Sequence, residues 1–179
     1  MKHMMKIALL VVLATGLVSC DLFNVDVETT FSGDLDITVD DPVMKSAADP
    51  YKFNSWTTLD PGDDEEVEKY KDQIVEVGVD NIIAEVEYVS DGGVTFLPGT
   101  YFVLYDDTDT VVWPQTEPWI IEVGTTLSIE DLEGRYDDVA AILEDTEEFT
   151  IGMVGTCSKA GVEVHVRIDI KSVITGSIF

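Results

Sequence analysis

The stretch VEVHVRIDIK, residues 162–171, alternates apolar and polar residues without interruption. This period of two is typical of a β-strand with one buried face and one solvated face. The same alternation occurs in FNVDVETTF at 23–31 and in LDITV at 35–39, with Ser32-Gly33-Asp34 between them. We therefore expect strands at all three places, and a hairpin over 23–39 that turns at Gly33.

Similar but shorter patterns predict further strands along the chain, at 53–59, 82–88, 94–97, 101–105, 111–113, 119–123, 149–156 and 173–179. Asp60-Pro61, followed by acidic residues, predicts a helix of about 12 residues that ends before Gly78. A second helix is expected within 129–145, where apolar residues recur at helical spacing. The sequence thus predicts a mainly β protein: an antiparallel β-sandwich of about 8–10 strands with two short peripheral helices.

Two parts of the chain resemble each other when one is shifted by 68 residues. Residues 57–94 and 125–162 then share 12 identities in 38 positions without a gap, among them Gly93 with Gly161. We interpret this as an internal duplication of a strand, a helix and a hairpin, with both copies sharing one core. The alternative is two similar local patterns in a compositionally biased chain.

The first 20 residues have the features of a secretory signal. Lys2 and Lys6 precede an apolar run from Ile7 to Val18, which is too short to span a membrane as a helix. The run ends in Leu17-Val18-Ser19-Cys20. This segment resembles the lipobox of bacterial lipoproteins. The resemblance implies cleavage before Cys20, a thioether-linked diacylglycerol on its sulfur, and usually a third acyl chain on the new amino terminus.

The signal peptide would then be residues 1–19, and residues 20–179 would form a single domain in the bacterial cell envelope, with the outer membrane favoured. In its pattern the body resembles uncharacterised bacterial β-sandwich lipoproteins. That likeness has no diagnostic motif, so it transfers no functional residue to this chain.

The mature part is strongly acidic. Eight basic residues remain against 36 acidic ones, a formal charge of 8 − 36 = −28. Such a surface repels nucleic acid, and we expect no nucleic-acid partner. The charge fits either solubility in a crowded envelope or binding of divalent cations. The acidic loop with Asp106, Asp107 and Asp109 is the candidate metal site, although it does not match an EF-hand.

Residues suited to catalysis are scarce. His165 is the one histidine after Cys20, and it lies on the polar side of its strand, where a solvated or ion-paired role is expected. Cys157 would have no partner once Cys20 carries lipid, and we expect a buried structural thiol. We expect no enzyme activity and no cofactor.

Trp113 and Trp119 flank the most distinctive loop, WPQTEPW. Exposed, they would offer flat rings to a glycan or a protein partner; buried, they would anchor strand ends in the core. The leading interpretation is a lipid-anchored, non-catalytic structural or interaction module. The alternative is an envelope lipoprotein that binds carbohydrate or a divalent cation, and exposure of both rings would favour that class.

Overall fold

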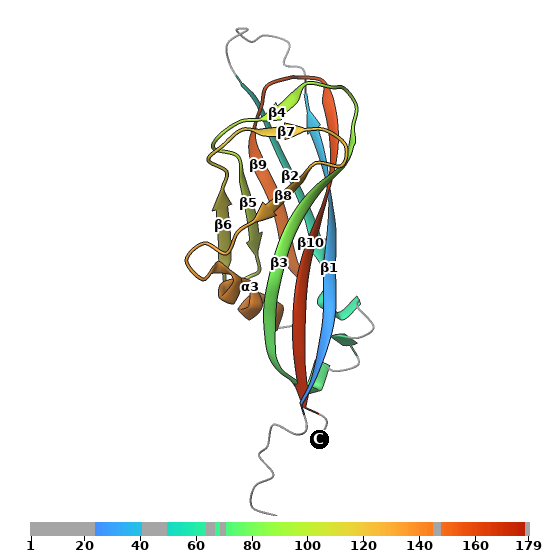
Figure 1. Cartoon of the computed structure of the whole chain (residues 1–179), viewed down its shortest axis with the longest axis vertical. Coiled ribbons are helices and arrows are strands. Elements are labelled where there is room, and N and C mark those ends of the chain that lie inside the picture. Colours follow the sequence, from blue (N-terminus) through green and yellow to red (C-terminus); the bar gives the residue numbers. More distant parts are fainter. Residues whose placement is uncertain (1–23, 41–49, 64–66, 69–70, 145–147, 178–179) are drawn as a thin grey trace, which may run out of the picture.

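The computed structural model describes residues 24–40, 50–63, 67–68, 71–144 and 148–177. Ten strands in this part form two antiparallel sheets (Figure 1). The first sheet has the order β1 (Asn24–Val39), β10 (Val162–Ser177), β3 (Ile74–Val89) and β8 (Thr126–Ile129). The second contains β6 (Thr110–Pro114), β5 (Tyr101–Tyr105), β9 (Phe149–Cys157), β4 (Val94–Phe96) and β7 (Trp119–Ile121), with β2 (Tyr51–Leu59) on the other side of β9.

The strand order is that of a jelly roll. β4 and β5 both pair with β9, so they act as one strand that is interrupted at Pro98-Gly99. β7 and β6 pair with the outer sides of β4 and β5 in the same way. If β4 and β5 are counted as one strand, and β6 and β7 as another, each sheet has four strands. The chain crosses repeatedly from one sheet to the other, as in the double Greek key of a jelly roll. The expected mainly β antiparallel sandwich is confirmed.

One core lies between the sheets. Alternate residues of the strands are fully buried there, including Leu35, Phe96, Met153 and Val166. The strands β1, β3 and β10 each have 16 residues and run the length of the molecule to the end where the carboxyl terminus lies (Figure 1). At about 3.3 Å per residue, each spans roughly 50 Å.

The hairpin expected over 23–39 is wrong. β1 is a single strand whose residues pair one by one with β10, and Gly33 lies opposite Ile168 in this ladder. Gly33 serves close packing instead of a turn, because a Cβ atom there would lie 3.0 Å from the Thr57 side chain and 3.2 Å from that of Leu59. β10 likewise continues through Ser172 where two strands were expected.

The two expected helices differ in outcome. α3 (Arg135–Glu144) lies within the predicted range and packs against β3. Over 60–77 the described residues contain only 3-10 turns at Pro61–Asp63 and Lys71–Gln73 and a helical conformation at 67–68, while 64–66 and 69–70 lie outside the description. β3 begins at Ile74, so the helix is wrong for 74–77. Pairing of this segment with the end of β10 outweighs the local helical spacing.

The hairpins expected within residues 57–94 and 125–162 are also wrong, because their strands exchange partners. β3 pairs with β10 and β4 pairs with β9, in registers related by the same shift of 68 residues: Val89 faces Val164, and Cys157 faces Phe96. β2 pairs with β9, while β8 pairs with β3. Leu59 and Leu127 are both half-buried against the core.

The two corners that follow β3 and β9 match in detail. The Ser90 amide donates to the Glu163 carbonyl at 2.9 Å, and the Ser158 amide donates to the Thr95 carbonyl at 2.9 Å. In return the Glu163 and Thr95 amides donate to the two serine hydroxyls, at 2.9 and 3.0 Å. Equivalent contacts at both corners agree with an internal duplication, which stays a prediction.

Candidate functional site

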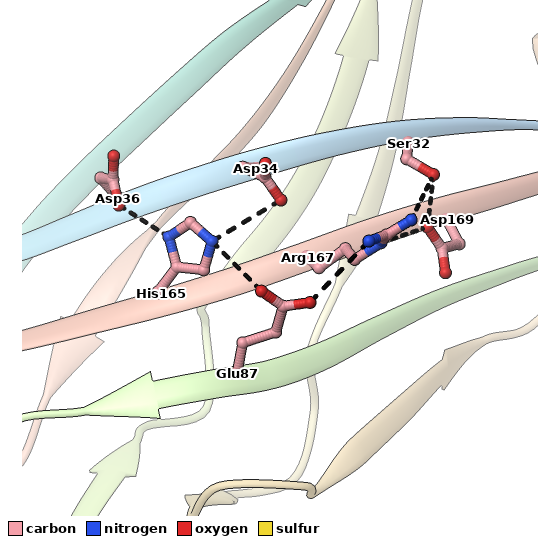
Figure 2. A network of polar contacts seen from close by, with 7 residues as sticks. All are labelled: Ser32, Asp34, Asp36, Glu87, His165, Arg167 and Asp169. Atoms are coloured by element: carbon pink, nitrogen blue, oxygen red, sulfur yellow. Dashed lines mark hydrogen bonds and ion pairs between the residues drawn. The ribbon is translucent and has the colours of Figure 1, made fainter.

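A cluster of polar side chains covers the outer face of the first sheet, where β1, β10 and β3 lie side by side (Figure 2). β10 is the middle strand and carries the two basic members of the cluster. The seven residues are Ser32, Asp34 and Asp36 from β1, His165, Arg167 and Asp169 from β10, and Glu87 from β3.

Strand alternation and register bring these side chains together. The apolar residues of β1 and β10 face the core, so every second residue faces solvent. In the ladder Asp36 lies opposite His165, and Asp34 lies opposite Arg167. On the other side, the β3–β10 register shifts between His165 and Val166, which leaves Glu87 as an extra residue on β3. Such a bulge redirects a side chain, and here the Glu87 carboxylate points toward His165 (Figure 2).

Three carboxylates surround the His165 ring. Its Nδ1 is 2.7 Å from Oδ1 of Asp36. Its Nε2 is 3.6 Å from Oδ1 of Asp34 and 3.4 Å from Oε2 of Glu87. The hydrogen bond with Asp36 is the largest effect and raises the pKa of His165 above its ordinary value. Burial, the next largest effect, lowers this pKa, and the charges of the three carboxylates raise it. His165 is thus paired on the polar face, one of the two roles expected for it.

Arg167 forms the second half of the cluster. Its Nε donates to Asp169 at 2.9 Å, and one terminal nitrogen donates to the Ser32 hydroxyl at 3.1 Å. The other terminal nitrogen lies 4.0 Å from Oε1 of Glu87. Glu87 therefore directs one oxygen to the guanidinium and the other to the imidazole. Among the described residues, Asp34, Glu87 and His165 place their ligand atoms within 4.8 Å of one another, close enough to share a metal ion.

Trp113 and Trp119 are buried, with only 5% and 7% of their surfaces exposed. Trp119 packs edge-on against Phe96 and lies beside Phe102. Trp113 also lines a cavity of about 240 Å³ beside residues 114–117. Both rings therefore anchor strand ends in the core, the alternative that the sequence left open.

The acidic loop at 106–109 uses its first carboxylate within its own turn. Oδ1 of Asp106 accepts hydrogen bonds from the amides of Thr108 and Asp109, at 2.7 and 2.6 Å. These backbone bonds lower the pKa of Asp106. The loop residues Asp107 and Asp109 do not join the group within 4.8 Å described above. The expected cation site at Asp106, Asp107 and Asp109 stays a prediction.

The two cysteines lie in different parts of the chain. Cys157 is fully buried at the end of β9, and burial raises the pKa of its thiol, as expected for a structural residue. Cys20 lies outside the described residues. In the part of the chain that the structure describes, no helix is both long and apolar enough to cross a membrane.

Sequence reasoning did not find the roles of Asp34, Asp36 and Glu87. Alternation places the two aspartates and His165 on polar faces, but only the β1–β10 register shows that they meet. The bulge at Glu87 leaves no such signal, because Ala84, Val86 and Tyr88 continue the alternation in the sequence, whereas in the structure Glu87 and Tyr88 are consecutive exposed residues. The sequence analysis also did not single out Trp56, which is 45% exposed and whose ring covers Gly152.

Comparison with known protein families finds no match, and comparison with curated proteins finds none either. Among solved structures, the decameric capsid protein of BFDV aligns with this chain at 9% sequence identity and a TM-score of 0.41. The alignment covers 84% of this chain and 99% of the capsid chain.

Proposed function

We propose that this protein is a bacterial envelope lipoprotein, held at a membrane by lipid on Cys20, whose jelly-roll body is a non-catalytic structural or interaction module. The observation that carries the proposal is the lipobox Leu17-Val18-Ser19-Cys20 at the end of a short apolar signal. Diacylglycerol with a third acyl chain would hold the protein firmly, since each buried CH₂ contributes about 0.8 kcal/mol.

The start of the fold supports a short tether. β1 begins at Asn24, four residues after Cys20, so the connection spans at most about 14 Å. Asn24 pairs with Ser177, and Ile74 of β3 pairs with Gly176 beside it. A lipid on Cys20 would therefore hold the end of the sheet where these three long strands meet, with the rest of the sandwich extending from the membrane.

Burial of Trp113 and Trp119, the two candidate ligand-binding rings, favours a structural or interaction module over a glycan site at their loop. A sugar ring stacks on an exposed aromatic face, and Trp113 and Trp119 offer little exposed surface. Burial of the Cys157 thiol supports a structural role for that residue, and the ion pairs of His165 support a role in holding the sheet together. For the cation-binding alternative, the cluster around His165 is a second candidate site beside the loop at 106–109.

Fractionation of cells that express the Cys20→Ala variant tests the anchor. We expect the wild-type protein in washed membranes and the variant in the soluble fraction, because the acyl chains provide the attachment. The matched control is Cys157→Ala, which removes the other cysteine and should remain with the membranes. A Cys20→Ala protein that stays in membranes after an alkaline wash would contradict the proposal.

A further inference from the structure

The spacing of three side chains on the outer face of the first sheet matches a metal ion of a particular kind. A tetrahedral Zn²⁺ ion has bonds of about 2.0–2.2 Å to nitrogen and oxygen, which places neighbouring ligand atoms about 3.3–3.6 Å apart. The Nε2 atom of His165 is 3.6 Å from Oδ1 of Asp34 and 3.4 Å from Oε2 of Glu87. We infer that Asp34, Glu87 and His165 bind one divalent transition-metal ion, with Zn²⁺ the best fit.

The histidine is held in the orientation that a metal ligand needs. A ligating imidazole usually donates its other N–H to a carboxylate, which fixes both the ring and its tautomer. Nδ1 of His165 lies 2.7 Å from Asp36, so a proton on Nδ1 leaves the Nε2 lone pair directed at Asp34 and Glu87 (Figure 2). Asp36 is thus a positioning residue for the proposed site.

The glutamate is also supported from outside the site. Its Oε1 lies 4.0 Å from Arg167, while Oε2 faces the imidazole. Arg167 is itself hydrogen-bonded to Asp169 and the Ser32 hydroxyl, and these contacts hold its guanidinium on the side of Glu87 away from His165. One oxygen of Glu87 is therefore free to bind the ion.

Ligand chemistry selects the class of metal. Calcium takes six to eight oxygen ligands, whereas imidazole nitrogen suits zinc and its transition-metal neighbours. Two carboxylates and a neutral imidazole balance the charge of a divalent ion. The Asp34 and Glu87 side chains are 63% and 42% exposed, which leaves room for solvent at a fourth ligand position.

Binding would join three strands across the sheet. Asp34 belongs to β1, His165 to β10 and Glu87 to β3. An ion held by all three stabilises the folded sheet, because it binds the native chain and not the unfolded one. The inference does not depend on the lipid anchor, and either can fail without the other.

Calorimetric titration with ZnCl₂ tests the site on the untagged full-length chain, purified in detergent, near neutral pH. We expect saturable binding of Zn²⁺ in the titration, and a higher melting temperature of the protein when Zn²⁺ is present. CaCl₂ at the same concentration should have a much smaller effect on both quantities. His165→Gln and Asp34→Asn should each weaken Zn²⁺ binding at least tenfold, and Asp36→Asn by about 10–100-fold. Glu163→Gln is the matched control: it removes an exposed carboxylate two residues from His165 and should leave the affinity unchanged.

Equal Zn²⁺ affinity in the wild type and in His165→Gln would overturn the inference, since the acidic surface would then attract the ion without a defined site. A calcium response as large as that of zinc would do the same. Circular dichroism checks that each variant is folded. If His165→Gln does not fold, Glu87→Gln provides the same comparison from a different strand.

Discussion

Gly155 shows at the scale of a single residue how closely the strands pack in this fold. It lies in β9 beside Thr100, where a Cβ atom would be 2.2 Å from the threonine hydroxyl and 2.7 Å from its Cβ. Thr100 is 1% exposed, and its hydroxyl donates to the Leu97 carbonyl at 2.8 Å. The threonine therefore has no room to move aside, and only glycine fits opposite it.

We predict that Gly155→Ala lowers the free energy of unfolding by about 1–3 kcal/mol, the usual cost of overpacking a core. Gly92→Ala is the control, because a Cβ atom at Gly92 has no neighbour within 4 Å. That control should change stability by less than about 0.5 kcal/mol. Urea unfolding of both variants measures the difference; two equal midpoints would show that Thr100 gives way.

Some residue properties could be predicted from the sequence and others could not. Alternation correctly places His165 on the polar face and Cys157 in the core. Alternation cannot show which polar side chains meet, because Asp36 and His165, which form a pair, are 129 residues apart in the sequence. The Trp113 and Trp119 rings were undecided for the same reason: their burial depends on which sheet covers them.

At the scale of elements, the errors share one physical cause. The turn expected at Gly33 and the helix expected up to Gly78 both rest on local preference. In each case a long neighbouring strand, β10, offers an unbroken row of hydrogen-bonding partners, and pairing with it outweighs that preference. By contrast, α3 is correctly predicted because its apolar face packs on the sheet and no strand competes for its backbone.

The corners at Ser90 and Ser158 carry a prediction of their own. Each serine hydroxyl accepts one strand amide, so Ser90→Ala and Ser158→Ala should each lower the free energy of unfolding by about 0.5–1.5 kcal/mol. Because the geometry is matched, the two costs should be similar. Ser128→Ala, at an exposed position of β8, is the control and should have little effect. Chemical denaturation of the three variants measures this, and a large loss at one corner alone would argue against equivalence.

At the scale of the whole molecule, the sequence predicts the class of fold but not its connectivity. Period-two segments separated by short turns are enough to indicate a sandwich with one core. The order in which strands pair is set by contacts between distant parts of the chain, as in β1 with β10, and these leave no local pattern. The jelly roll and the cluster around His165 therefore emerge only from the assembled sheets.

The net charge of −28 from Cys20 onward gives a prediction for the molecule as a whole. Like charges on one small domain repel, and salt screens them, since the Debye length is about 10 Å at 0.1 M. We expect NaCl to raise the melting temperature of the metal-free protein, measured by differential scanning fluorimetry in the presence of a chelator. A melting temperature that falls as NaCl is added would show that favourable ion pairs outweigh the repulsion.

Mass spectrometry of the intact protein from membranes tests the central claim, lipid attachment at Cys20, most directly. The account predicts a chain that begins at Cys20, with added mass equal to a diacylglycerol and usually one further acyl group. Fragmentation should place that mass on residue 20. A mature chain that retains residues 1–19, or that begins at an unmodified Cys20, would contradict the account.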